Sequence, residues 1–187
     1  MSDRVKVRIA EVKTAPHLHM RWMIRRDMPE VSAIEDACFQ WDAWTEEQFL
    51  SCLRQRNCIG MVAELGDPVV GFVIYELHKH SLEILKLAVW PDRWRQGVGA
   101  FIADKIVHKL SSHRRTFVTL TVRETDLAAQ LFFRAQGFRA SGVLRGHFDG
   151  EDGVRMRYEL EVGGCAGCGA KFYSREAAHE HECPCDL

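Results

Sequence analysis

One stretch, residues 89–110, constrains the fold of this chain more than any other, because it joins a strand, a glycine-rich turn and a long amphipathic helix. The turn reads Arg95, Gln96, Gly97, Val98, Gly99, Ala100. Glycines let an anion approach the main chain closely, and the first turn of a helix offers unpaired N–H groups at the positive end of its dipole. The stretch therefore predicts a phosphate-binding turn. The same glycines are also compatible with a tight turn that only lets the helix pack closely.

Two well-known phosphate loops are excluded at this turn. The dinucleotide-binding fingerprint needs a third glycine, where this chain has Phe101 and Ile102. The Walker loop needs Gly-Lys-Ser/Thr, which does not follow here. The bound anion has to be identified from the segments that flank the turn.

Composition limits the classes of function. The 187 residues are 47% hydrophobic and carry a net charge of -1, which gives no reason to expect attraction to nucleic acid or membranes. No apolar run is long enough to span a bilayer, and no signal-peptide core is found near the N-terminus. The cysteine total of seven is odd, which favours reduced thiols. We therefore expect a cytoplasmic protein.

The patterns along the chain predict an α/β (α+β) protein. Strands are expected at residues 20–25, 59–65, 69–77, 82–89, 117–122, 138–144 and 154–162. Helices are expected after Asp27, where Glu30 completes a capping box, after Thr45, where Gln48 completes another, after the glycine turn, and after Asp126. Gly137 is expected to end the last of these helices. Phe39, Trp41 and Trp44 lie between the first two helices and predict either a substrate groove or simple packing.

The element order and four segments resemble the GNAT acyltransferase superfamily over residues 20–161. The segments are 34–44, 87–92, the glycine turn and 122–138; Trp94 stands where this superfamily usually has Gln or Arg. Within the superfamily the chain resembles the RimI-type ribosomal-protein N-terminal alanine acetyltransferases. The resemblance implies a GNAT fold, with a mixed sheet that is splayed near its middle so that a cofactor enters between two strands.

The resemblance also implies a cofactor and an acceptor. Acetyl-CoA would be held along the strand by Leu87, Ala88 and Val89, and the Val89 amide would stabilise the oxyanion. The pyrophosphate would lie on the turn from Arg95 to Ala100. Asp126 stands at the position of a family Asn that lies near coenzyme A. The acceptor would be a protein N-terminal α-amine, ribosomal in the RimI-type branch.

The departures from the family pattern fall on its acid and base. The general base, a Glu on the strand after the cofactor helix, is Thr121 here, and the Tyr general acid is Phe133. Threonine is no base near neutral pH, and phenylalanine has no proton to donate. The usual acid/base pair is therefore missing from this chain.

Three interpretations remain open. An α-amine is partly deprotonated at pH 7, so transfer to a protein N-terminus can proceed without a strong base. Alternatively, Glu83 serves as the base, since it matches the position of the catalytic Glu of the histone acetyltransferase branch. Third, the domain binds acetyl-CoA without turnover, as a regulatory or scaffold protein. A small-molecule amine is a further alternative for the acceptor.

The last residues of the chain predict a small zinc finger. Cys165, Cys168, His181 and Cys185 have the spacing of a C2H2-like unit with Cys as the last ligand, and a segment this short needs a metal to fold. Cys183 and His179 are alternative ligands. The predicted domains are an extension at 1–19, the acetyltransferase domain at 20–162 and the finger at 163–187.

The charge of the finger argues against DNA binding. Lys171 and Arg175 face four acidic residues there, whereas phosphate binding needs an excess of positive charge. We expect the finger, with its structural Zn²⁺, to dock a protein partner or to cap the acetyltransferase domain.

Overall fold

The computed structural model describes residues 17–111, 114–161, 163–164 and 171–172. Its centre is a seven-stranded sheet in the order β1-β2-β3-β4-β5-β7-β6. Neighbouring strands are antiparallel, except that β4 and β5 are parallel. The prediction of a mixed sheet is thus confirmed.

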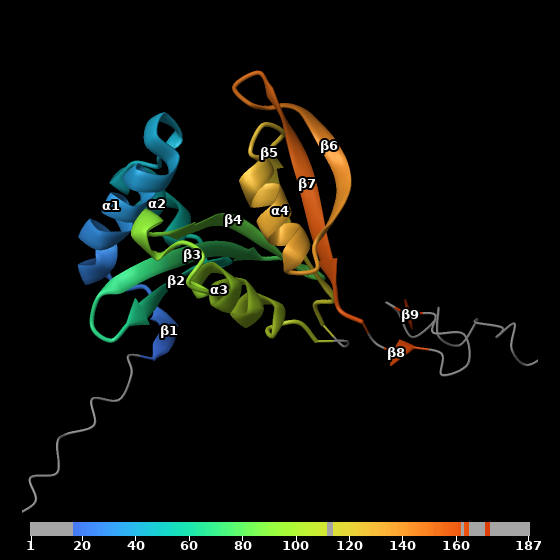
Figure 1. The fold of residues 1–187 in the computed structure, drawn as a ribbon, viewed down its shortest axis with the longest axis horizontal. Helices are drawn as coiled ribbons and strands as arrows, with labels where there is room; N and C mark the ends of the chain where they lie inside the picture. The colour runs from blue at the N-terminus through green and yellow to red at the C-terminus, as the bar shows by residue number, and fades with distance from the viewer. Residues whose placement is uncertain (1–16, 112–113, 162, 165–170, 173–187) are drawn as a thin grey trace, which may run out of the picture.

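The sheet consists of two arms that diverge where β4 meets β5 (Figure 1). One arm contains β1 (Leu18–Trp22), β2 (Cys58–Leu65), β3 (Val69–Leu77) and β4 (Ser81–Val89). The other contains β5 (Phe117–Arg123), β7 (Glu151–Glu159) and β6 (Arg139–Phe148). Only residues 81–84 of β4 pair with residues 117–120 of β5, so the strands separate beyond this point.

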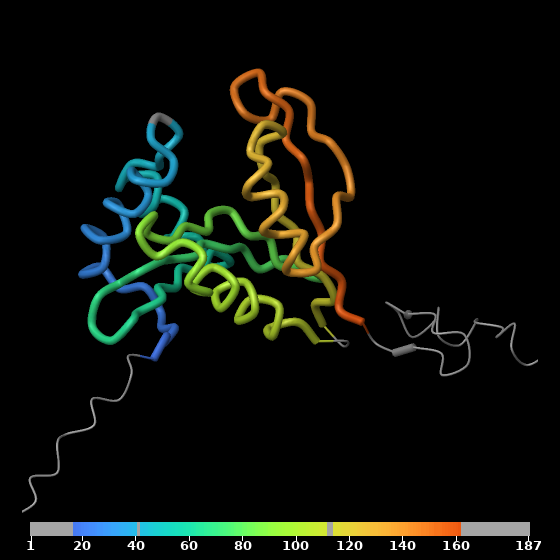
Figure 2. Tube along the Cα trace, in the orientation of Figure 1, coloured from blue at the N-terminus to red at the C-terminus, as the bar shows by residue number. Residues whose placement is uncertain are grey.

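Helices cover both faces of the sheet. The helices α1 (Met28–Phe39) and α2 (Glu46–Leu53) pack on one face, and α3 (Val98–Val107) and α4 (Leu127–Ala135) pack on the other. Short 3-10 turns precede α1, join α1 to α2 and follow β4: η1 (Arg25–Asp27), η2 (Gln40–Asp42) and η3 (Pro91–Arg93). Figure 2 shows that the connection through η2 lies at one end of the helix pair, toward the second arm.

The core has two layers because β3 is buried on both faces. Phe72 and Ile74 of β3 pack under α1 and α2, and Val73 and Tyr75 pack under α3. This arrangement buries a near-continuous apolar run in β3, as is typical of a strand covered on both sides. The central strands are thereby fixed between the helices, and the opening beside β4 has a rigid wall.

Several local signals act as the sequence predicts. Thr45 begins α2, with hydrogen bonds that join it reciprocally to Gln48. The Asp126 carboxylate accepts the Ala129 N–H at 2.9 Å and begins α4. Gly137 follows α4 with a φ of 89°, the left-handed conformation that favours glycine. These elements depend on contacts between residues at most four positions apart in the chain. Sequence patterns predict such local contacts well.

The predicted capping box at Asp27 is wrong. Asp27 precedes α1, but its carboxylate binds the Ile24 N–H at 2.8 Å and the Arg21 guanidinium at 2.6 Å rather than capping the helix. The Arg21 hydrogen bonds lower the pKa of the Asp27 carboxyl. Because Arg21 lies on β1 and also binds Glu64 of β2 at 2.8 Å, this acid ties the start of α1 to the sheet.

The last two strands are placed differently from the prediction. They run to Phe148 and start again at Glu151, so that Asp149 and Gly150 form the connection. Both have positive φ, 47° and 97° respectively. A two-residue hairpin of this kind favours Asp-Gly, so this pair is the sequence signal for the longer strands.

The C-terminal predictions lie largely outside the described residues. This holds for Cys165, Cys168, His181 and Cys185, and also for residues 1–16. The described pieces, β8 (Gly163–Gly164) and β9 (Lys171–Phe172), pair antiparallel. In the described ranges, no cluster of three or more His, Cys, Asp or Glu side chains could hold a metal ion. Nor is any helix of that part of the chain long and apolar enough to cross a membrane.

Candidate active site

The end of β4 forms one wall of an opening in the sheet. Residues 85–89 have no partner in β5, and residues 121–123 of β5 pair with β7 alone. The Trp90 N–H binds the Val70 carbonyl of β3, and main-chain groups alternate sides along a strand. The N–H groups of Val89 and Leu87 therefore point away from β3, into the opening, whereas those of Ala88 face β3.

Two side chains bind the Val89 carbonyl on the open side. The Trp94 indole N–H donates to it at 2.7 Å, and the Cys38 thiol donates at 3.2 Å. Burial raises the pKa of the Cys38 thiol, which keeps the proton it donates. Trp94 therefore has a definite role in this structure: it fixes the end of β4, although its ring is 56% exposed.

The turn after β4 presents main-chain N–H groups beside this opening. Gly97 precedes α3 with a φ of 85°, and no side chain caps the helix. Arg95 is also left-handed, with a φ of 59°, and the Gln96 side chain binds the Asp92 carbonyl at 2.7 Å. The first N–H groups of α3, from Val98 onward, are thus left for an external partner. Such an arrangement can bind phosphate.

The two glycines of the turn have different roles. A Cβ at Gly97 would meet nothing within 4 Å, so this glycine is needed for its backbone conformation. A Cβ at Gly99 would lie 3.2 Å from the Phe132 ring and 3.8 Å from Val89. Gly99 thus allows α3 to approach both α4 and the end of β4. Close packing and anion binding, the two interpretations of the motif, are compatible here.

The two positions predicted for the family base and acid, Thr121 and Phe133, contain no titratable group. Thr121 lies on β5 opposite Arg155, and its methyl group packs against Gly153. Phe133 is buried and contacts Phe132 and Phe138 edge-on. These two side chains serve packing only.

Glu83 lies in the half of β4 that is paired with β5. It is opposite Glu76 on one side and Thr119 on the other, and its carboxylate lies 3.1 Å from His78 Nε2. It is six residues before Val89, or about 20 Å along an extended strand. The structure does not bring Glu83 and Val89 together.

A buried ion pair lies behind the free half of β4. Lys86 Nζ is 2.8 Å from Glu35 Oε1, and the exposed fractions of the side chains are 10% and 0%. Glu35 Oε1 also accepts the Trp44 N–H at 2.9 Å. Burial raises the pKa of the Glu35 carboxyl, although the Lys86 and Trp44 hydrogen bonds act in the opposite direction. Sequence patterns do not predict this pair, because its members lie on elements far apart in the chain.

The aromatic residues between α1 and α2 surround this lysine. Lys86 Nζ lies 4.0 Å from the Phe39 ring centroid and 5.3 Å from that of Trp44. Trp44 also packs edge-on against Phe49 of the core. Of the two predicted roles for these aromatics, packing is the one observed for Phe39 and Trp44.

Asp42 of η2 links the two arms across the opening. Its carbonyl accepts from Lys86 of β4 at 3.3 Å, and its carboxylate lies 2.9 Å from Arg123 Nη2 at the end of β5. Arg123 also binds Glu151 of β7 at 2.8 Å. Hydrogen bonds from Thr125 and Arg123 lower the pKa of the Glu151 carboxyl. Carboxylates thus lie on the α1 and α2 face, opposite α3 and the turn.

Comparisons with known proteins agree with this arrangement. A family model described as "Acetyltransferase (GNAT) family" matches residues 20–138. The [ribosomal protein bS18]-alanine N-acetyltransferase of Escherichia coli (strain K12) is 24% identical over 127 residues, which are 68% of this chain and 84% of that protein.

Solved structures share the fold. The Escherichia coli ribosomal-protein-S18-alanine N-acetyltransferase superposes with a TM-score of 0.70 at 21% identity, covering 80% of this chain and 98% of that one. Arabidopsis thaliana Naa50, in complex with the bisubstrate analogue CoA-Ac-MVNAL, gives 0.65 at 13% identity, covering 76% and 99%.

Proposed function

This chain belongs to the acetyltransferase (GNAT) family, and from that premise we propose that it transfers the acetyl group of acetyl-CoA to the N-terminal α-amine of a protein. The observation that carries the proposal is the opening beside residues 85–89 of β4, with its main-chain N–H groups next to an uncapped helix start. A ribosomal protein is the acceptor suggested by the relative's name.

The residues at the opening fit acetyl-CoA. The N–H groups of Leu87 and Val89 would hold the arm of the cofactor, and the turn from Arg95 to Ala100 would hold its pyrophosphate. Acetyl-CoA supplies an activated thioester. Asp126 is assigned to this site by its family position alone, since its carboxylate already caps α4.

The chain's contribution to transfer is positioning and charge stabilisation. The Val89 N–H is aimed into the opening, where it can donate to an oxygen that gains negative charge, a role worth roughly 10²–10³-fold in rate. Threonine at position 121 cannot act as the base that the family Glu supplies. An acceptor amine that is already partly neutral is therefore favoured.

The missing base selects for an α-amine over a lysine. At pH 7 an α-amine with a pKa near 7.8 is neutral about 340 times more often than a lysine with a pKa near 10.4. The acceptor would approach from the side that bears Asp42 and Glu151, opposite the turn that would hold the pyrophosphate.

Acetyl-dependent release of coenzyme A thiol tests the proposal. The full chain would be incubated with acetyl-CoA and peptides that carry a free N-terminus, and the same peptides blocked at the N-terminus but containing lysine would serve as controls. We expect release with the free N-termini and at least tenfold less with the blocked peptides. Equal release from both sets would contradict the α-amine assignment.

Two alternatives have specific support. The replacements at Thr121 and Phe133 favour an acetyl-CoA-binding regulatory or scaffold protein that does not turn over. Binding of acetyl-CoA without release on any peptide or amine would establish it. Release with small amines, but not with peptides, would instead establish a small-molecule acetyltransferase.

We also propose that Cys165, Cys168, His181 and Cys185 hold a structural Zn²⁺. The ligand spacing supports this, as does the pairing of β8 with β9 on either side of the first two cysteines. One zinc per chain by elemental analysis is expected, falling when Cys165 and Cys168 are both changed to Ser. Unchanged zinc content would contradict it. Docking of a protein partner by the finger and a cytoplasmic location stay predictions.

A further inference from the structure

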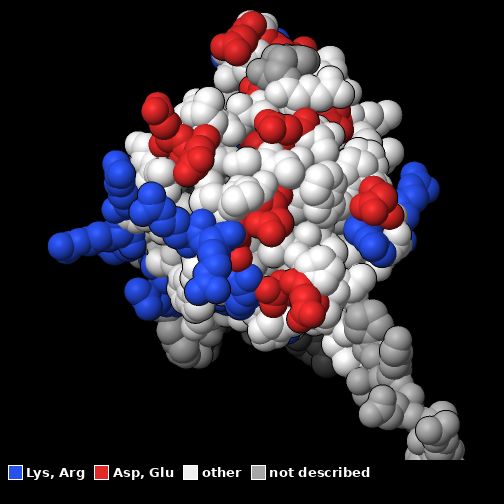
Figure 3. Space-filling view, turned by 90° about the vertical axis from the view of Figure 1, so that its left-hand side faces the viewer, with Lys and Arg blue, Asp and Glu red and all other residues white. Residues whose placement is uncertain are grey.

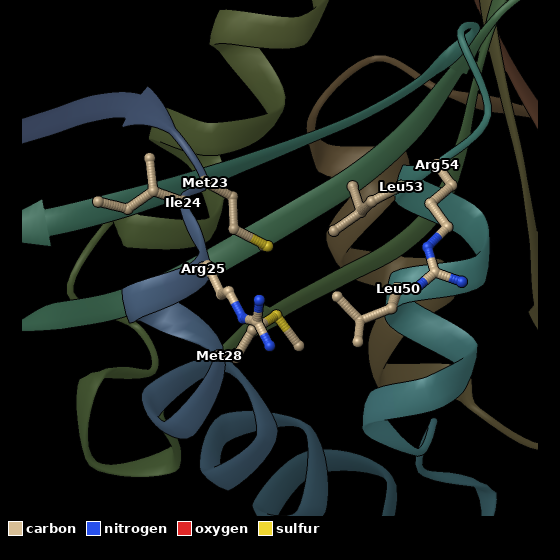
Figure 4. Close-up of a pocket in the computed structure, with 7 residues that line it drawn as sticks. All are labelled: Met23, Ile24, Arg25, Met28, Leu50, Leu53 and Arg54. Atoms are coloured by element: carbon tan, nitrogen blue, oxygen red, sulfur yellow. The ribbon is translucent and has the colours of Figure 1, made fainter.

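A pocket between the start of α1 and the end of α2 lies apart from the opening (Figure 4). Its volume is about 300 Å³, and it is lined by Met23, Ile24, Arg25, Met28, Leu50, Leu53 and Arg54. Figure 4 shows Arg25 and Arg54 on opposite sides, with the apolar side chains around the space between them. The pocket therefore combines an apolar lining with two guanidinium groups.

The length of α1 separates this pocket from the candidate active site. Met28 begins α1 and lines the pocket, whereas Cys38, near the other end, contacts Val89. Ten helical residues span about 15 Å. A molecule in the pocket would not occupy the opening beside β4.

Within the described part of the chain, no acidic side chain forms an ion pair with Arg25 or Arg54, the two arginines of the pocket. Arg25, Arg26, Arg54 and Arg56 are exposed, and their side chains form no ion pair or hydrogen bond within the described part of the chain. The neighbouring Arg21 differs, because it binds both Asp27 and Glu64. Figure 3 shows basic side chains gathered on one side of this face of the molecule. Four unpaired positive charges here contrast with a net charge of -1 for the chain.

Large apolar side chains are exposed on the same segment. Ile24, which lines the pocket, is 50% exposed, and Trp22 is 61% exposed. Exposed aromatic and aliphatic side chains beside arginine are typical of the energetic centre of protein interfaces. Methionines such as Met23 and Met28 adapt their shape to different partners.

We propose that this pocket docks an acidic segment of a partner protein, whose apolar side chains enter it while its carboxylates pair with Arg25 and Arg54. The two arginines favour acidic residues in the partner segment by charge complementarity. The methionine and leucine side chains that line the pocket favour an apolar residue between those acidic residues. A nucleic acid would satisfy the arginines but leave the apolar lining without a contact. Binding here is independent of acetyl transfer.

Methionine methyl NMR of the full chain tests the site with a defined probe. The probe is an N-terminally blocked peptide of Glu and Leu, which offers no α-amine to the opening. We expect the methyl signals of Met23 and Met28 to shift, while those of Met61 and Met156, buried in the core under α3 and α4, stay in place. No binding, or shifts of the core methionines alone, would overturn the proposal.

Charge-reversal variants separate this site from general attraction. Arg25→Glu with Arg54→Glu should weaken peptide binding at least tenfold, about 1.4 kcal/mol. Arg134→Glu with Arg139→Glu, at two exposed arginines on α4 and β6, is the charge-matched control and should leave it unchanged. Equal losses in both would overturn the proposal, as would a single-stranded RNA oligonucleotide that displaces the peptide. A peptide with Ser for Leu should lose binding.

Discussion

The two halves of β4 differ in what they can do, although they belong to one strand. Residues 81–84 are paired on both sides, by β3 and β5, so their main-chain groups are used within the sheet. Residues 86–89 are paired with β3 only, after a register shift at Leu85, and their other edge faces the opening. Glu83, the side chain with the right chemistry for a base, lies in the paired half. Val89, which has only a main chain to offer, lies in the free half.

This difference shows that pairing, rather than residue type, decides where the site lies. An unpaired strand edge inside a protein is costly unless a ligand or side chain satisfies it. Here Trp94 and Cys38 satisfy one carbonyl, and the N–H groups of Val89 and Leu87 are left for a ligand. The buried Glu35 and Lys86 pair holds the free half in place from behind.

Loss of this pair should have the largest effect on the molecule. Lys86→Met leaves the Glu35 carboxylate buried without its counter-ion, and we expect the free energy of unfolding to fall by about 3–5 kcal/mol. Urea unfolding would measure it. A second change, Glu35→Gln in the same chain, should restore part of the loss. A decrease in the free energy of unfolding of less than about 1 kcal/mol would show that the pair does not stabilise the free half of β4.

The stability lost in Lys86→Met should depend on pH. Burial raises the pKa of the Glu35 carboxyl, so the folded state keeps its proton to a higher pH than the unfolded state. The contribution of Glu35 to stability is then greatest below the ordinary carboxyl pKa of about 4.3 and declines as the pH rises through the raised value. Lys86→Met should therefore lose less at pH 4 than at pH 8. An equal loss at both would contradict a buried charge as the cause.

The two glycines after the free half should respond differently to alanine. Gly97→Ala places a side chain at a φ of 85° and should cost about 1–2 kcal/mol while weakening acetyl-CoA binding. Gly99→Ala brings a methyl group against the Phe132 ring. Phe132→Leu in the same chain should relieve this steric clash. Thermal unfolding and a binding titration would measure both. If Phe132→Leu also restored the stability lost in Gly97→Ala, the assignment of different roles to the two glycines would be contradicted.

Asp42→Asn should have a smaller effect, confined to the acceptor. It keeps the carbonyl for Lys86 but removes the charge that faces Arg123. We expect a stability loss under about 1 kcal/mol, typical of a partly exposed pair, and a several-fold higher KM for the peptide. Steady-state kinetics would measure it. A change in the KM for acetyl-CoA alone would contradict the assignment of Asp42 to the acceptor side of the opening.

Glu83→Gln should have the smallest effect of all. Because Glu83 lies about 20 Å along the strand from Val89, its loss should leave kcat/KM within about twofold. A loss of roughly 10²-fold or more, with the stability unchanged, would identify Glu83 as the base.

The sequence predicts the elements of this fold better than the contacts between them. The capping box of Thr45, the end of α4 at Gly137 and the turn after β4 depend on neighbours in the chain. The contacts of Asp42 with both arms do not depend on chain neighbours, because Lys86 and Arg123 come close to Asp42 only after the sheet has formed.

Long-range pairing also explains the errors. Glu35 of α1 is charged but buried, because Lys86 of β4 compensates its charge. Asp27 has the composition of a helix cap, but Arg21 of β1 engages it instead. The assignment of the family base and acid positions to Thr121 and Phe133 stays a prediction.

Replacing a single main-chain N–H tests the central claim most directly. An amide-to-ester exchange at Val89, made with the hydroxy acid of valine, removes the N–H that faces the opening and keeps the side chain. The same exchange at Ala88 removes an N–H that faces β3. The first should lower kcat for acetyl transfer by roughly 10²-fold or more, and the second should lower stability while kcat stays within about threefold. Equal kcat in the two esters would contradict the assignment of the free half of β4 as the catalytic wall.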